Sequence, residues 1–318
     1  MCAKSYTLKR GCFDSSDGIN KVAYYIFEPK EKPSAIIQIS HGMCEYIERY
    51  EEFADFICDE GIVVCGNDHL GHGNTAKCDE DLGFIAERGG YRFVLDDLQK
   101  MTELAKGEYP DIPLILLGHS MGSFFARLYM SELPDSADAV IISGTAGPES
   151  PTGAGKLLAR INTFFFGGRN RSKFIYKIAF GNYSKKYPKD SPEHLWISRD
   201  GEILQKYAND KFCTFRFTAS AYHDLFTVLG KVSKKRWAKT LRHDMPILMI
   251  SGDMDPVGNW GRGVVKVYER IKGAGVQDIT LKLYRDGHHE MLNETNRYDV
   301  FYDILAWLKY HGFVKETD

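Results

Sequence analysis

One short segment limits the folds open to this chain more than any other. Residues 118–122 read Gly-His-Ser-Met-Gly, after an apolar run at 113–117 and before a segment at 121–133 with helical patterning. A Gly-x-Ser-x-Gly sequence between a buried strand and a helix predicts a sharp turn that raises the serine oxygen above a sheet. The two glycines allow the neighbouring backbones to approach. We therefore expect a nucleophile at Ser120.

The apolar runs along the rest of the chain predict an α/β fold. Because the predicted strands alternate with helices, right-handed crossovers would place them in a mostly parallel sheet with helices on both faces. A length of 318 residues suits one large domain, or a core domain with an insertion. We expect strands at 22–27, 35–40, 62–66, 113–117, 139–143, 246–251 and 279–284, and helices at 50–60, 91–106, 121–133, 264–271 and 297–310.

Charge is distributed unevenly along the chain, although the whole sequence has a net charge of only −2. Residues 147–240 contain 18 Lys and Arg against 7 Asp and Glu, a net charge of +11, which leaves −13 for the remainder. A break of this size predicts an insert with a surface role of its own. We therefore expect a core in two parts, 1–146 and 241–318, and a mainly helical, aromatic-rich insert at 147–240.

Composition excludes several classes of protein. With 43% hydrophobic and 26% charged residues, the chain is globular and neither disordered nor fibrous. No run approaches the ~20 apolar residues of a membrane span, and the first ten residues lack the apolar region of a secretory signal. Seven scattered cysteines without a Cys-x-x-Cys pair predict reduced thiols in a cytoplasmic protein. We expect no cofactor, no metal and no nucleic-acid partner.

A serine nucleophile needs a base, and the base needs an acid that orients it. In this kind of fold the partners follow the serine in the order Asp, His. Asp253 and Asp255 follow one predicted strand, and His288 and His289 follow the last one, so both pairs lie at the carboxyl ends of strands. We favour Asp255 because a short turn lets its carboxylate reach back beneath an imidazole. Only one of the two histidines can face the serine.

Acyl transfer also needs backbone N–H groups that bind the developing oxyanion. One such donor normally follows the nucleophile, here Met121, and the second comes from an earlier loop. The loop after the strand at 35–40 reads His-Gly-Met-Cys-Glu, and we expect Met43 to supply that second N–H. Cys44, in the same loop, has no evident base and is interpreted as an inert small side chain.

Three stretches carry a resemblance to a known family. They lie at 41–50, 68–73 and 289–294, and with the Ser120 turn they make the chain similar to the α/β-hydrolase superfamily, in particular its monoacylglycerol lipase and lysophospholipase branch. The branch usually reads His-Gly-x-Gly/Ala-Glu-His, followed by Arg-Tyr. Here Cys44 stands in place of the small residue and Tyr46 in place of the histidine, changes that would either narrow the acyl site or repack it.

The resemblance implies an α/β-hydrolase fold with a Ser120–Asp255–His289 triad, a Met43/Met121 oxyanion hole and a lid formed by the insert. The implied reaction is hydrolysis of carboxylic esters of monoacyl lipids, such as monoacylglycerols or lysophospholipids, through an acyl-enzyme. An aminopeptidase, amidase or thioesterase could use the same triad, although an aminopeptidase needs a lid carboxylate and the insert has few acids. A non-catalytic binding module would be expected to have a broken triad.

Other residues admit two interpretations each. Glu45 and Arg49, four residues apart, either support the site from behind or form a solvated surface pair. The histidines at 41, 69 and 72 could suggest a metal cluster, but no carboxylate or cysteine at ligand spacing completes one, and we interpret Gly71-His72-Gly73 as a loop that shapes the site. The insert interleaves aromatic with basic residues, as in 164–177. These aromatics either pack the insert onto the core, or they rest with the cations on anionic lipid surfaces.

Overall fold

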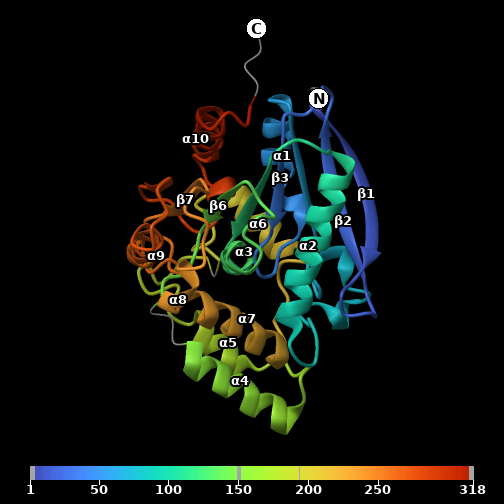
Figure 1. Cartoon of the computed structure of the whole chain (residues 1–318). Helices are drawn as coiled ribbons and strands as arrows, with labels where there is room; N and C mark the ends of the chain where they lie inside the picture. Colours follow the sequence, from blue (N-terminus) through green and yellow to red (C-terminus); the bar gives the residue numbers. More distant parts are fainter. Residues whose placement is uncertain (1–3, 149–151, 193, 315–318) are drawn as a thin grey trace.

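The computed structural model describes residues 4–148, 152–192 and 194–314. Within these ranges the strands form one eight-stranded sheet in the order β1-β2-β4-β3-β5-β6-β7-β8 (Figure 1). The β1–β2 and β2–β4 pairs are antiparallel, and all other neighbours are parallel. The mostly parallel α/β sheet expected from the sequence is confirmed.

The elements lie close to the expected ranges. The strands are β1 (Tyr6–Asp14), β2 (Lys21–Pro29), β3 (Ala35–Ser40), β4 (Ile62–Asn67), β5 (Leu114–His119), β6 (Ala139–Ser143), β7 (Ile247–Gly252) and β8 (Ile279–Tyr284). The α-helices are α1 (Glu51–Asp59), α2 (Gly90–Glu108), α3 (Met121–Glu132), α4 (Thr152–Phe166), α5 (Lys173–Phe180), α6 (Gly201–Asn209), α7 (Ala219–Val232), α8 (Lys235–Ala238), α9 (Arg262–Lys272) and α10 (Arg297–Tyr310).

Two apolar layers, one on each face of the sheet, hold the core together. In β5, Leu114 and Leu116 pack in the layer that contains α2, α3 and α9, whereas Ile115 and Leu117 pack in the layer that contains α1 and α10. Because successive side chains point to opposite faces, a strand covered on both sides must be apolar throughout. This explains the continuous apolar runs by which the central strands were recognised.

The first strand, β1, was not expected from the sequence. It lies at one edge of the sheet, and its residues alternate between half-buried and exposed. Lys9 lies in its middle and forms an ion pair with Glu28 of β2. An edge strand is covered less completely than a central one and needs no continuous apolar run, so β1 lacks the pattern that marks the other strands.

Helices α4, α5 and α7 of the insert lie together below the sheet in the view of Figure 1, and α10 lies at the top of the view. Helix α7 packs against the core helices α2 and α3, and α4 packs on α7. The carboxyl ends of the parallel strands therefore face the insert. None of the helices in the described ranges is both long enough and apolar enough to cross a membrane.

Candidate active site

Ser120 lies at the turn between β5 and α3 in a backbone conformation that a non-glycine residue rarely adopts. Its φ is 52° and its ψ is −119°, a conformation that costs about 1–3 kcal/mol and persists only where the surroundings impose it. The flanking glycines are required sterically. A Cβ on Gly118 would lie 2.6 Å from the Cβ of Ala126, and one on Gly122 would collide with the Ser40 carbonyl oxygen.

Hydrogen bonds hold this turn in place. The Ser120 N–H donates to the Ser143 carbonyl (3.0 Å), and the Ser123 hydroxyl donates to the Ser120 carbonyl (2.5 Å). The Ser123 hydroxyl also lies 2.8 Å from Oγ1 of Thr145, which in turn accepts from the buried Arg127. The turn is thereby tied to the segment that follows β6.

The structure brings His289 and Asp255 together. His289 Nδ1 lies 2.9 Å from Asp255 Oδ2, and both side chains are buried. The other oxygen of Asp255 accepts from the Val257 N–H (2.8 Å), which fixes the carboxylate. Burial alone would lower the pKa of His289, but the charge and hydrogen bond of Asp255 outweigh it, so this pKa lies above its usual value.

The neighbouring acid and histidine have different partners. Asp253 Oδ1 accepts a hydrogen bond from the Asp286 N–H (2.8 Å), which joins the loops that follow β7 and β8. His288 Nδ1 lies 2.5 Å from the Leu195 carbonyl of the insert, and its ring packs on Tyr187. Neither residue takes part in the His289–Asp255 contact, so the geometry separates the two members of each pair.

Ser120, His289, Met43 and Met121 all line one cavity of about 860 Å³. The cavity lies between the core and the insert. Its apolar wall comes from both, with Phe124, Leu229 and Val257 among the lining residues, together with Ile178, Ala179, Phe180, Leu225 and Phe226. The serine turn, a histidine–carboxylate pair and two candidate N–H donors thus open on a site that can hold a largely apolar ligand.

The loop that carries Met43 is held tightly. Cys44 has a φ of 57°, in the left-handed region, and its thiol donates to the Phe215 carbonyl of the insert (3.2 Å). Burial raises the pKa of Cys44, so the thiol stays protonated, as expected for an inert side chain. Tyr46, the other departure from the family pattern, donates to Asp210 of the insert (2.7 Å).

Glu45 and Arg49 do form a pair, but it is not a solvated one. Their side chains are 4% and 11% exposed, and Arg49 Nη1 lies 3.1 Å from Glu45 Oε2. Arg49 also binds Glu290 through both of its terminal nitrogens, at 2.8 and 2.7 Å. Glu290 lies in the stretch 289–294 that carries the family resemblance, but no role was expected for its side chain. We call Glu45, Arg49 and Glu290 the Glu–Arg–Glu cluster.

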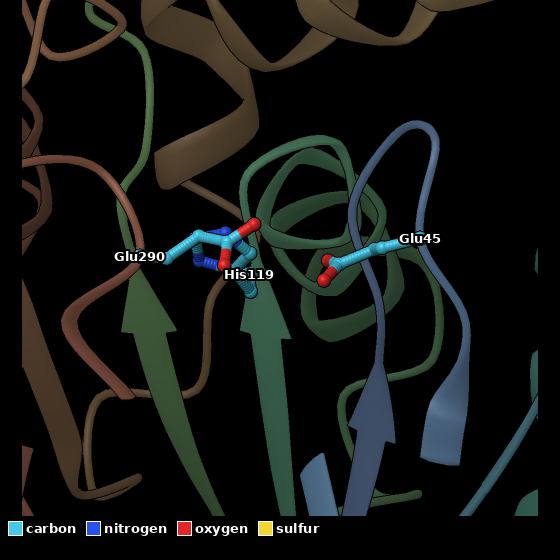
Figure 2. Close-up of side chains that lie close together, drawn as sticks. All are labelled: Glu45, His119 and Glu290. Atoms are coloured by element: carbon cyan, nitrogen blue, oxygen red, sulfur yellow. The ribbon is translucent and has the colours of Figure 1, made fainter. Parts of the chain in front are cut away.

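His119 completes the surroundings of this cluster. Figure 2 shows Glu45 and Glu290 reaching toward it from opposite sides, one from the loop after β3 and the other from the loop that carries His289. Burial and the nearby His289 lower the pKa of His119 to about 3, so the ring is neutral at pH 7. Ligand atoms of the three residues lie within 4.8 Å of one another, a spacing that could hold a metal ion. Arg49, however, already supplies the positive charge.

Three other buried histidines, His41, His69 and His72, lie close together. His41 Nε2 accepts from the backbone N–H of His69 (2.9 Å), and the two rings lie 4.1 Å apart. Burial lowers the pKa of His69 to about 3 and that of His72 to about 4, so these rings are neutral at pH 7. They join the loops that follow β3 and β4.

The insert also contacts the histidine loop directly, which no sequence signal indicated. The His289 N–H donates to the Trp196 carbonyl (3.1 Å), and the Glu290 N–H donates to the Ile197 carbonyl (2.8 Å). The ring of Trp196 packs 5.2 Å from that of His289. Part of the insert therefore helps to hold the histidine.

The chain matches known proteins over most of its length. Residues 31–296 match the model of a family described as serine aminopeptidase, S33. A monoglyceride lipase homolog of Monkeypox virus is 34% identical over 285 residues, which cover 89% of this chain and 92% of the viral protein. The monoglyceride lipase of Homo sapiens is 29% identical over 302 residues, which cover 91% and 88% of the two chains.

A solved structure of an esterase has a similar fold over almost the whole chain. A carboxyl esterase from Bacillus coagulans, in complex with glycerol, superposes with a TM-score of 0.89 at 27% identity. The match covers 96% of this chain and 98% of the esterase.

Proposed function

The chain belongs to the serine aminopeptidase S33 family of α/β-hydrolases, and from this premise we propose that it cleaves carboxylic esters of monoacyl lipids, of the monoacylglycerol or lysophospholipid type. It is an esterase- and lipase-like hydrolase by its similarity to known proteins. The observation that supports the narrower proposal is the cavity of about 860 Å³, which is apolar along much of its wall and reaches Ser120.

In the proposed reaction Ser120 Oγ attacks the acyl carbonyl while His289 Nε2 takes its proton. The N–H groups of Met43 and Met121 bind the oxyanion of the tetrahedral intermediate. As the carbon–oxygen bond to the alcohol breaks, His289 returns the proton to the departing alkoxide, and an acyl-enzyme remains. Asp255 holds the imidazole in the required tautomer and stabilises its protonated form.

Water then completes the cycle. His289 removes a proton from a water molecule, whose oxygen attacks the acyl carbon. When the second tetrahedral intermediate collapses, the proton passes to Ser120 and the fatty acid leaves. The raised pKa of His289 favours its role as a base, because the imidazole then binds a proton more readily.

The insert is proposed to act as a lid that docks on anionic lipid surfaces. Seven large apolar side chains of α4 and α5 are between 43% and 81% exposed. We call these residues the outer patch: Leu157, Ile161, Phe164, Phe165, Phe166, Phe174 and Ile178. Ile178 also lines the cavity, so the patch adjoins it.

Cations lie among the residues of the outer patch. Arg160, Lys173 and Lys177 are exposed on the same two helices. Aromatic residues favour the membrane interface, and each basic residue near an anionic surface contributes roughly 1 kcal/mol.

Free thiols, which include those of Cys44 and Cys213, support a reducing, cytoplasmic location.

An aminopeptidase is the alternative on the same triad. It would need a carboxylate from the insert to bind the amino terminus of a peptide. Among the described residues that line the cavity, Glu45 and Glu290 are the only acids, both come from the core, and Arg49 binds both. Because Arg49 already binds both carboxylates, neither is left to bind a peptide amino terminus, which favours an ester over a peptide as the substrate.

A labelling experiment and a hydrolysis panel test the proposal. A fluorophosphonate probe should label the wild type covalently and should not label Ser120→Ala. The panel compares p-nitrophenyl esters of graded chain length with monoacylglycerols, lysophospholipids and aminoacyl anilides. Turnover of the monoacyl lipids is expected. Labelling that persists without Ser120, or turnover of the anilides alone, would contradict the proposal.

A further inference from the structure

Arg49 joins two loops that approach the proposed active site from opposite sides. One of its partners, Glu45, lies two residues after Met43 in the loop that follows β3. The other, Glu290, directly follows His289 and lies 241 positions from Arg49 along the chain. A single guanidinium therefore connects the proposed oxyanion donor and the proposed general base.

On the oxyanion side, Glu45 carries the restraint to the backbone. Its Oε1 accepts hydrogen bonds from the Gly42 N–H and from the hydroxyl of Tyr50, the latter at 2.9 Å. Gly42 immediately precedes Met43, so the carboxylate fixes the turn that presents the Met43 N–H. The left-handed backbone of Cys44 makes this turn strained, and strain of this kind needs support from its surroundings.

On the histidine side, Glu290 is fixed at both ends. Its backbone N–H binds the Ile197 carbonyl, and its Oε2 accepts from the Asn293 side chain at 2.8 Å. Its carboxylate meets Arg49 through two parallel bonds, at 2.8 and 2.7 Å. The two-bonded geometry sets direction as well as distance, which a single ion pair cannot do.

We propose that Arg49 is a positioning residue that braces the Met43 loop against the His289 loop, an inference that rests on the proposed function. With 11% of its side chain exposed, Arg49 lies within the protein, where two carboxylates share one guanidinium. Glu290, whose carboxylate Arg49 holds in place, directly follows His289, and its negative charge favours the imidazolium formed during the reaction. Lysine could supply the charge of Arg49 but not its planar fork.

The pKa values of the two carboxylates in the Glu–Arg–Glu cluster depend on Arg49. Burial raises the pKa of Glu45, and Arg49 opposes that rise. Burial would also raise the pKa of Glu290, but Arg49 outweighs it and holds this pKa below its usual value. Removing the guanidinium would therefore leave the carboxylates without their shared partner, and the two loops would lose their common contact.

The first test is Arg49→Lys, with hydrolysis of a soluble short-chain ester as the assay. We expect kcat to fall about 100-fold, since a misplacement of about 1 Å has an effect of this size, while KM changes less than about twofold. Arg297→Lys is the matched control, because Arg297 also bridges two carboxylates, Glu52 and Asp200, but these do not line the cavity as Glu45 and Glu290 do. The control should keep its kcat, and thermal unfolding would report whether both variants fold.

A double-mutant cycle decides the question even if Arg49→Lys does not fold. Glu45→Gln and Glu290→Gln lie on different loops and remove one charge each. If both act through one brace, the double variant should lose little more kcat than the worse single variant. If the two losses multiply, each residue acts locally and the brace is wrong. Glu52→Gln serves as the control for a lost carboxylate.

The wild type separates this inference from the proposed function. If the wild type neither reacts with fluorophosphonate nor hydrolyses the ester, the proposed function fails. If the wild type is active and folded Arg49→Lys retains its kcat, the brace is overturned while the proposed function stands. A loss of kcat in Arg49→Lys and not in Arg297→Lys, together with a non-multiplying cycle, supports the brace.

Discussion

The core and the insert differ in where their large apolar side chains lie. In the core, strands such as β3 and β5 are buried along their whole length. In the insert, α4 turns Leu157, Ile161 and Phe164 outward, with exposed fractions of 59%, 46% and 81%, and buries Gly155 and Ala159 instead. Small residues at the packed face and large apolar ones at the outer face reverse the usual amphipathic arrangement.

This difference indicates a division of tasks. The core holds a strained serine turn and a histidine–carboxylate pair at fixed positions, for which close packing on both faces of a sheet is suited. The outer patch exposes large apolar side chains to solvent, and exposed apolar surface gathered on neighbouring helices is typical of interaction surfaces. Other parts of the insert contact the core, among them the carbonyl groups of Trp196 and Ile197, which bind the histidine loop.

The largest expected effect concerns the core. His289→Ala should lower kcat by about 10⁶-fold, because the base and the nucleophile act as a unit. His288→Ala is the matched control, and it should retain most of the activity, since His288 contacts Leu195 and Tyr187. Hydrolysis of a p-nitrophenyl ester measures both. An equal loss in the two variants would mean that the insert contact of His288 is as necessary as the base.

The next effect distinguishes the two acids. Asp255→Asn should lower kcat by about 10⁴-fold, because an amide in that position favours the wrong imidazole tautomer. Asp253→Asn keeps an oxygen that can accept from the Asp286 N–H, so it should change kcat little. Steady-state kinetics of both variants are the measurement, and the reverse order would assign the orienting role to Asp253.

A smaller effect is expected on vesicle binding, and only from changes in the insert. Replacing Phe164, Phe165 and Phe166 together by serine should weaken binding to phosphatidylserine vesicles about 100-fold, if each ring contributes roughly 1 kcal/mol. Hydrolysis of a soluble short-chain ester should not change. Vesicle co-sedimentation across a salt series measures the binding, which should weaken as salt rises.

Serine in place of Tyr298, Tyr302 and Tyr310 provides the matched control, because these rings are 51%, 61% and 84% exposed but belong to the core. Vesicle binding that falls equally in both triple variants, or that ignores lipid charge and salt, would remove the distinction between the two surfaces.

The smallest effect is a shift in pH dependence. His289 must be neutral to act as a base, so kcat/KM should fall as the pH drops through the pKa of this histidine. Asp255 holds that pKa above the usual value of about 6.5, so the acidic limb of the profile should lie above pH 6.5. Glu290→Gln removes a second, weaker negative charge and should move the limb to lower pH. An unmoved limb would show that Glu290 does not act on His289.

Much of the fold could be predicted because its signals are local. Strands β3, β5 and β7 are covered on both faces and must be apolar throughout, so their sequences mark them without reference to neighbours. The serine turn needs Gly118 and Gly122 to avoid specific backbone collisions, which makes it readable as a pattern. Strand β1 escaped detection because all of its residues are half-buried or exposed, so its sequence need not be apolar.

Within the candidate site, the sequence determined which residue types follow each strand, and therefore the candidates Ser120, Asp255 and His289. Only the tertiary structure decided that Arg49 holds Glu45 and Glu290 together, and that Trp196 of the insert contacts His289. The physical reason is range. Backbone turns and strand burial depend on adjacent residues, whereas a buried ion pair depends on which distant loops the sheet brings within about 3 Å.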